Sequence, residues 1–209
     1  MTKSSPHPLF SLALFLPLFL FHTSWGRSGD LESYGSIRNI CASRRLSYPP
    51  PHLRIVIYKS ERSLEVHSGP FLLRQYHVVF GTKPIQDKQE IGDNATPEGG
   101  FYVCRKNPMS RFYRFIGISY PNSEDALRGL VEGLITPNQY TSILSALGRG
   151  VMPPWNTRLG GNIGIHGGGT GVDWTWGCIA MSNRDIEEIY ELVQIGTPVF
   201  IRRTSRIWR

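Results

Sequence analysis

Hydrophobic and polar residues alternate in several short stretches that follow residue 52. The clearest stretches are "HLRIVIYKS" at residues 52–60, "RSLEVHS" at 62–68 and "FLLRQYHVVFG" at 71–81. Each contains β-branched or aromatic residues and ends near a turn-forming residue, a pattern typical of strands. Further strands are predicted at residues 101–104, 112–121, 162–166 and 197–202.

Three other stretches have helical spacing and capping residues. Ser123 is the expected N-cap of a helix over residues 124–134, and Thr136 begins a capping box that ends with Gln139. That second helix is expected to end at Gly148, and a third helix begins at another capping box, residues 182–185. The order of elements predicts a mainly β domain with inserted helices, built as a β-sandwich or barrel-like mixed body.

The N-terminal region has the pattern of a secretory signal peptide at residues 1–26. Lys3 precedes an apolar run of thirteen residues at 9–21, which is short for a membrane span, and Ser24 and Gly26 suit a cleavage site. An uncleaved anchor is the alternative. Polar and Pro-rich residues 27–51 are expected to be a linker, followed by a domain at 52–203 and a basic tail at 204–209.

The charge and the expected export limit the classes of partner. The net charge is +7 and becomes +6 without the leader, which would draw an exported protein to anionic surfaces. Because the basic residues are scattered and the chain is expected in the periplasm or cell envelope, no nucleic-acid partner is expected. The sequence does not indicate an oligomeric state.

Three cysteines allow at most one internal disulfide. Cys41 and Cys104 are candidates for a structural pair, which would leave Cys178 as a free thiol. The alternative is that all three cysteines are reduced.

The strongest candidate for chemistry is the segment "NIGIHGGGTGVDWTWGC" at residues 162–178. His166 ends a predicted strand, and Cys178 follows twelve residues later with five glycines between them. A nucleophilic cysteine needs a base to ionise it and amide donors for the oxyanion formed on attack. His166 is the candidate base, with the Gly167 carbonyl orienting its ring, and the amides of Gly177 and Cys178 are the candidate donors. Taken singly, such a His and such a Cys are more often structural.

The same segment, with "IAMSNRDIEEIY" after it, resembles the signature of the L,D-transpeptidase (YkuD) catalytic domain. The strand-turn-strand "VVFGTKPIQD…TPEGGFYV" also resembles that family, and the similarity covers roughly residues 52–203. The resemblance implies Cys178 as nucleophile, His166 as base and the Gly177 and Cys178 amides as oxyanion hole. Thr175 and Trp176 belong to the matching motif, and Trp174 and Trp176 are expected to wall the substrate site.

The resemblance further implies a role in cell wall biogenesis and cell shape. The reaction would pass through a thioester on a peptidoglycan stem tetrapeptide, release D-Ala and form a 3-3 crosslink or attach a wall component. Carbapenem-type lactams are expected inhibitors, and no metal or organic cofactor is expected. A zinc site built from His67, His77 or His166 with Cys178 is a weak alternative, because their spacing is not typical of zinc ligands.

Two positions depart from the family pattern. Trp176 stands where a second His is common, and Ala180 stands where Arg or Asn is common. The loop between His166 and Cys178 is also shorter than usual. These differences leave open an L,D-carboxypeptidase or amidase that passes the acyl group to water, and a non-catalytic wall-binding domain. A further hypothesis is that residues 123–148 cap the cleft with Trp155 at its mouth; the alternative is ordinary packing.

Overall fold

The computed structural model describes residue 1 and residues 35–205, so the predicted leader lies outside the described residues. Residues from Gly35 onward form one compact unit. Within the described part the strands are β1 (Leu53–Tyr58), β2 (Ser63–Ser68), β3 (Phe71–His77), β4 (Gly99–Ser110), β5 (Tyr113–Ile118), β6 (Gly164–His166), β7 (Ile179–Ala180) and β8 (Pro198–Arg202). The helices there are α1 (Ile37–Ser43), α2 (Ser123–Val131), α3 (Pro137–Gly148) and α4 (Asn183–Leu192).

The strands of the described residues join in one sheet with the order β3-β2-β1-β8-β4-β5-β6-β7. The pairs β1–β8 and β6–β7 are parallel, and the other neighbours are antiparallel. Just after β3, Val79 exchanges two backbone hydrogen bonds of 2.9 and 2.8 Å with Ala180 of β7. The two ends of the sheet therefore meet, and the body is barrel-like. The predicted mainly β fold with inserted helices is confirmed.

The inward faces of the strands form the main core. The predicted alternation buries Leu64 and Val66 of β2, and the apolar run of β1 is buried as well, whereas the buried residues of β3 are Leu73 and Tyr76, three positions apart. Ile186 and Ile189 of α4 pack into the same core. This burial holds β6 and β7, which carry the candidate catalytic residues, against the rest of the sheet.

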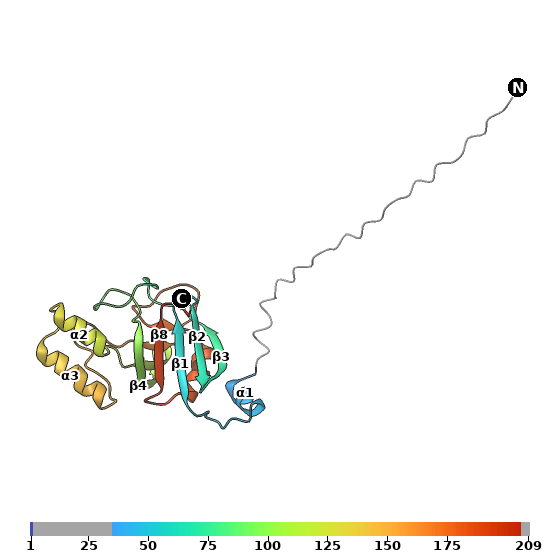
Figure 1. Cartoon of the computed structure of the whole chain (residues 1–209), viewed down its shortest axis with the longest axis horizontal. Helices are drawn as coiled ribbons and strands as arrows, with labels where there is room; N and C mark the ends of the chain where they lie inside the picture. The colour runs from blue at the N-terminus through green and yellow to red at the C-terminus, as the bar shows by residue number, and fades with distance from the viewer. Residues whose placement is uncertain (2–34, 206–209) are drawn as a thin grey trace. The chain divides into compact units, whose positions relative to one another are not determined.

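Helices α2 and α3 lie together beside the β4 side of the sheet (Figure 1). They share a small core of their own, in which Ala126, Ile135, Ile143 and Leu159 are buried. The N-cap of α2 is Asn122 and not Ser123 as predicted, because the Asn122 side chain accepts from the amide of Asp125 and the Asp125 carboxylate accepts from the amide of Asn122. The capping box predicted at Thr136 is confirmed.

The segment predicted to be a linker contains α1. Ile37 and Cys41 of this helix are about 1% exposed and belong to the main core. The Ile37 amide donates to the Glu188 carboxylate over 2.6 Å, and the Tyr76 hydroxyl donates to the same carboxylate over 2.8 Å. The linker prediction was therefore wrong for this segment, and α1 is part of the folded body. The sequence shows little sign of it, because the two apolar residues that pack on the core are surrounded by polar residues and glycines.

The three cysteines are free, so the Cys41–Cys104 disulfide considered above is not formed. Cys41 is buried in α1, whereas Cys104 lies on β4, and burial raises the pKa of the Cys104 thiol to about 12. Within the described residues, no helix combines the length and apolar character needed to cross a membrane.

Replacement of Ile37 tests whether α1 contributes to stability. Ile37→Ala is expected to lower the free energy of unfolding by about 2–5 kcal/mol, because a fully buried isoleucine leaves a cavity. The control Ile195→Ala removes a side chain that is 55% exposed and is expected to change stability by less than about 0.5 kcal/mol. Denaturant titration of the purified chain measures both values, and equal effects would contradict the docking of α1.

Candidate active site

His166 and Cys178 are brought together by the parallel pairing of β6 with β7. Ile165 pairs with Ile179, and His166 pairs with Ala180. Paired residues point to one face of a sheet, and so do residues two positions apart on a strand. Cys178, two residues before Ala180, therefore lies on the same face as His166.

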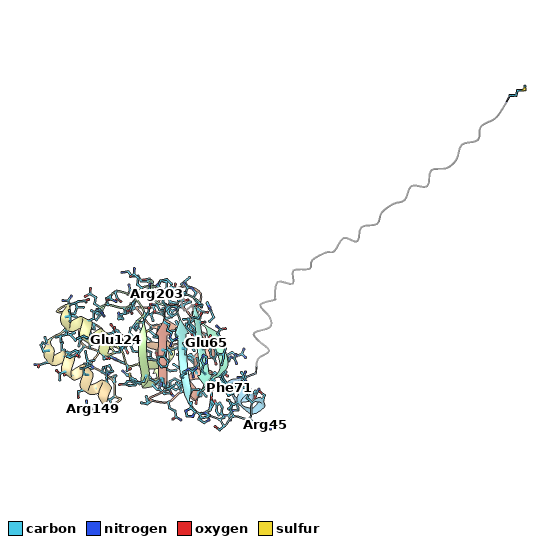
Figure 2. The ribbon with its side chains drawn as sticks, in the orientation of Figure 1. Arg45, Glu65, Phe71, Glu124, Arg149 and Arg203 are labelled. Carbon is cyan, nitrogen blue, oxygen red and sulfur yellow. The ribbon has the colours of Figure 1, made fainter. Side chains whose placement is uncertain are left out.

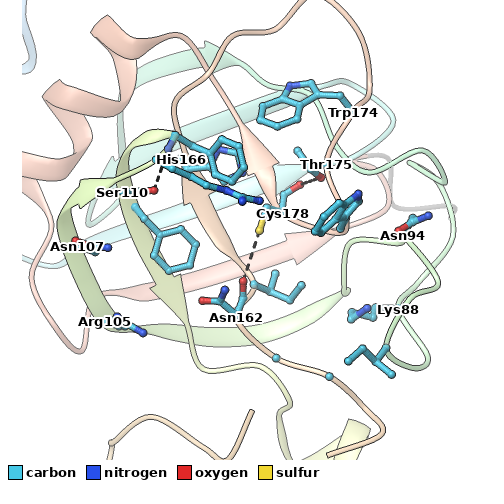
Figure 3. Close-up of a pocket in the computed structure, with 18 of the residues that line it drawn as sticks. Lys88, Asn94, Arg105, Asn107, Ser110, Asn162, His166, Trp174, Thr175 and Cys178 are labelled. Carbon is cyan, nitrogen blue, oxygen red and sulfur yellow. Dashed lines mark hydrogen bonds between the residues drawn. The ribbon is translucent and has the colours of Figure 1, made fainter. Parts of the chain in front are cut away.

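Both side chains line an open cavity of about 1060 Å³. Figure 3 shows the imidazole of His166 directed toward the sulfur of Cys178, at the centre of the residues that surround the cavity. The β4–β5 hairpin forms one wall and the loop that contains Lys88 and Asn94 forms the opposite wall. The predicted proximity of the two residues is therefore seen in the structure, within a space that can hold a peptide.

Hydrogen bonding and stacking fix the orientation of the His166 ring. Its Nδ1 lies 2.6 Å from the Gly167 carbonyl oxygen, as the sequence predicted. A carbonyl oxygen only accepts, so Nδ1 carries the hydrogen and Nε2 keeps a lone pair for a proton. Phe112 stacks on the ring with centroids 4.8 Å apart, and Trp174 contacts its edge at 5.4 Å.

The turn after His166 is held by the first residue of α4. The Asn183 side-chain oxygen accepts from the Gly168 amide over 2.9 Å. A Cβ at Gly167 would lie 2.4 Å from that same oxygen, so a side chain there would displace the Asn183 amide. Asn183 therefore positions the carbonyl that orients His166, a role the sequence analysis did not predict.

Burial shifts the pKa of both candidate catalytic groups toward the neutral form. It raises the pKa of the Cys178 thiol to about 11, although the Gly164 amide and the charge of Lys88 act in the opposite direction. Burial also lowers the pKa of His166, opposed by its bond to Gly167. Near pH 7 the resting pair is therefore a thiol and a neutral imidazole.

Thr175 organises the turn that carries the cysteine. Its hydroxyl donates to the Cys178 carbonyl over 2.7 Å and accepts from the Gly177 amide over 3.2 Å. Gly177 has a φ of +116°, and a Cβ there would lie 2.6 Å from the Ala95 carbonyl oxygen. The Gly177 amide is thus already engaged by Thr175, whereas the Cys178 sulfur donates only a weak 3.6 Å contact to the Asn162 carbonyl.

A second anchor holds the loop between His166 and Cys178. Asp173 forms a two-pronged ion pair with Arg62, with both N–O distances 2.6 Å, and accepts from the Phe80 amide over 3.0 Å. Nothing in the local sequence indicates this contact, because Arg62 and Asp173 are 111 residues apart. The pair ties the loop that carries Trp174 to the strand end near Phe80.

The tryptophans differ in their surroundings. Trp174 is half-buried and donates to the Gly169 carbonyl over 3.2 Å, whereas Trp176 is 76% exposed at the edge of the cavity. Several polar residues that the sequence analysis missed also line the cavity: Lys88, Asn94, Arg105, Asn107, Ser110, Arg111 and Asn162. They lie on β4, on its hairpin turn and on loops, where the sequence shows no motif.

The cap hypothesis is not supported by the cavity. Within the described residues, neither 123–148 nor Trp155 is among the side chains that line it. The Trp155 ring instead packs against Gly161 and Gly117, and α2 and α3 pack on each other. In residues 35–205, no three His, Cys, Asp or Glu side chains gather as a metal site would require.

Alkylation of Cys178 tests the neutral thiol–imidazole pair. The rate constant with iodoacetamide is expected to rise about tenfold per pH unit between pH 7 and 10, because only the thiolate reacts. Mass spectrometry of the Cys178 peptide follows the reaction, with the Cys104 peptide as an internal reference. A plateau that begins near pH 6 would instead indicate a preformed thiolate–imidazolium pair.

Comparison with known proteins gives an independent assignment. The family model for the L,D-transpeptidase catalytic domain, YkuD, matches residues 52–201. The Escherichia coli (strain K12) protein named "Putative L,D-transpeptidase YafK" is 30% identical over 153 residues, which cover 70% of this chain and 48% of that protein. The chain thus spans about half the length of the curated relatives that it matches.

Solved structures share the fold. The helical cell shape determining protein Pgp2 from Campylobacter jejuni superposes with a TM-score of 0.50 at 21% identity, over 74% of this chain and 49% of that one. Its K307A mutant gives a TM-score of 0.51, also at 21% identity and 74% coverage of this chain, with 48% of that chain covered. With the family match over residues 52–201, these findings confirm the resemblance noted from the sequence: the chain belongs to the L,D-transpeptidase (YkuD) catalytic domain family.

Proposed function

We propose that this protein is a cysteine-dependent L,D-transpeptidase that acts on peptidoglycan stem peptides in the periplasm or cell envelope. The observation that carries the proposal is the placement of Cys178 and His166 on one face of the sheet in a cavity of about 1060 Å³. Family membership supports the reaction class, and the leader-like N-terminal sequence supports the location. The bond attacked joins the L-centre of the stem diamino acid to the terminal D-Ala.

In the first half-reaction, Nε2 of His166 removes the Cys178 proton as the sulfur attacks the scissile carbonyl carbon. A general base is required because the resting thiol, with a pKa of about 11, is protonated at neutral pH. The Cys178 amide is the proposed donor to the oxyanion, since the Gly177 amide is engaged by Thr175. The imidazolium then protonates the departing amine, D-Ala leaves, and a thioester remains.

In the second half-reaction, the amine of a second stem attacks the thioester carbonyl. His166 accepts the amine proton, the C–S bond breaks, and the proton returns to the Cys178 sulfur. An amide crosslink forms and the free enzyme is restored. The low pKa of His166 suits both steps, because the neutral imidazole is present throughout the neutral pH range.

A hydrolase on the same scaffold is the second candidate. Trp176 is largely exposed at the cavity edge, and Ala180 is fully buried in β7, so neither of the two positions that depart from the family pattern offers a titratable side chain to an acceptor amine. Water could then resolve the thioester. The sequence also raised a non-catalytic wall-binding domain as a third possibility. Binding alone would not require an oriented His166 ring beside a thiol.

Incubation with purified muropeptides distinguishes these functions. Mass spectrometry is expected to show dimers for transfer, shortened monomers for hydrolysis, and unchanged substrate for binding alone. Cys178→Ala is expected to lower turnover on the order of 10³-fold or more, because the nucleophile is lost. Cys104→Ala, which changes a thiol outside the cavity, is the control, and a carbapenem is expected to add its mass to Cys178 alone.

Replacement of Thr175 tests its role in positioning the nucleophile. Thr175→Val removes the hydroxyl and is expected to reduce kcat roughly tenfold to a hundredfold with little change in KM. Thr175→Ser keeps the hydroxyl and is expected to retain activity within a few-fold. A loss in Thr175→Ser as large as the loss in Thr175→Val would contradict this role, because the serine variant keeps the hydroxyl that bonds Gly177 and Cys178.

A further inference from the structure

The side chains that line the cavity carry an excess of positive charge, which has no role in the proposed mechanism. Among the described residues that line it, Lys88, Arg105 and Arg111 are basic, and none is an aspartate or a glutamate. Lys88 is neutralised by Asp93, with an N–O distance of 2.8 Å. The two arginines are therefore the source of the positive charge available to a ligand.

Both arginines lack a protein partner for their guanidinium groups. No hydrogen bond or ion pair joins either group to another residue of the described part, although Arg111 lies over the Phe112 ring at 4.6 Å. Some other arginines on the same body are paired, for example Arg62 with Asp173 and Arg114 with Glu187, whereas Arg105 and Arg111 are exposed and, within the described residues, unpaired. An unpaired guanidinium in a cavity wall presents a fork of donors that matches a carboxylate.

The sheet register places Arg105 in line with the nucleophile. Arg105 of β4 pairs with Gly117 of β5, and Gly117 pairs with Gly164 of β6. The pairing of Ile165 with Ile179 sets Gly164 opposite Cys178. Arg105 and Cys178 are thus the two ends of one row, about 14 Å apart at their backbones, because neighbouring strands are spaced by ~4.8 Å.

The two glycines in the row leave room for a flat apolar floor. A Cβ at Gly117 would meet the Phe115 ring at 3.0 Å, and a Cβ at Gly164 would meet it at 2.7 Å. The Phe115 ring therefore lies across both positions and lines the cavity between Arg105 and Cys178. Figure 3 shows Arg105 on the β4 side of the cavity and Cys178 near its centre, with Asn162 beside the sulfur.

We propose that Arg105 is a specificity-determining residue that binds a carboxylate of the donor stem peptide, while its scissile carbonyl lies at Cys178 and its backbone crosses Phe115. This inference rests on the proposed function. Because the backbones of Arg105 and Cys178 are about 14 Å apart, the carboxylate lies several bonds from the reacting carbon. Arg111 adds positive charge at the hairpin turn and attracts the same anionic ligand.

A stem tetrapeptide carries up to three carboxylates: on D-Glu, on the side chain when the diamino acid is diaminopimelate, and on the terminal D-Ala. Four synthetic peptides separate them. The reference peptide is L-Ala–γ-D-Glu–diaminopimelate–D-Ala, and each of the others lacks one carboxylate, through lysine, D-isoglutamine or D-alaninamide. Calorimetry measures binding to the full chain that carries Cys178→Ala, so no turnover disturbs the titration.

One of the three altered peptides is expected to bind about tenfold or more weakly than the reference peptide, and that peptide identifies the carboxylate. Adding Arg105→Gln is expected to weaken binding of the reference by a similar factor and to abolish the difference between the two peptides. Arg105→Lys keeps the positive charge but loses the two parallel N–H donors of the guanidinium. Its affinity for the reference peptide is expected to lie between that of the chain with Arg105 and that of the Arg105→Gln variant. The control Arg149→Gln removes a charge at the end of α3, outside the cavity (Figure 2), and is expected to change nothing.

The proposal is overturned if Arg105→Gln leaves all four affinities unchanged, weakens all four equally, or if none of the peptides binds. Turnover of the same peptides by the chain with Cys178 intact separates this result from the proposed function. Turnover that does not depend on Arg105 would contradict the carboxylate site and leave the proposed enzymatic function standing. Binding that depends on Arg105 but is not followed by turnover would contradict the proposed enzymatic function and support the carboxylate site.

Discussion

The parallel pairing of β6 with β7 is the constraint on which the candidate active site depends. These strands have only three and two residues, so their own hydrogen bonds contribute little stability. They are held because Ile165 and Ile179 are fully buried and because Val79 pairs with Ala180 from the other end of the sheet. Closure of the sheet therefore does two things: it removes an exposed edge, and it fixes which residue lies opposite His166.

Around this pairing, a set of polar contacts fixes the orientation of the side chains that the two strands carry. Asn183 holds the Gly168 amide, the Gly167 carbonyl orients the imidazole, and Thr175 holds the turn before Cys178. The pair Arg62–Asp173 anchors the intervening loop. Asn183, Arg62 and Asp173 do not line the cavity, whereas Thr175 does, so contacts both within and behind the cavity wall determine the positions of His166 and Cys178.

The electrostatics of the cavity follow from the same enclosure. Burial keeps the thiol and the imidazole neutral, so the charge that faces a ligand comes from the arginines on β4 and its turn. The cavity thus has a neutral end at His166 and Cys178 and a basic end at the arginines, with the Phe115 ring in its lining. Under the function proposed above, this charge would orient an anionic peptide before its carbonyl reaches the sulfur.

The sequence by itself determined most of the elements and the family. Alternation of apolar residues marked the strands, the capping boxes marked two of the helices, and the segment from His166 to Cys178 with its glycines carried the chemistry, because all of these signals are local. The tertiary structure alone decided the helix at 37–43 within the expected linker, the free state of the cysteines, the Arg62–Asp173 anchor and the row from Arg105 to Cys178. Those features depend on strand register and on contacts between residues far apart in the chain, and register is set by how the whole sheet closes and not by any one stretch of residues.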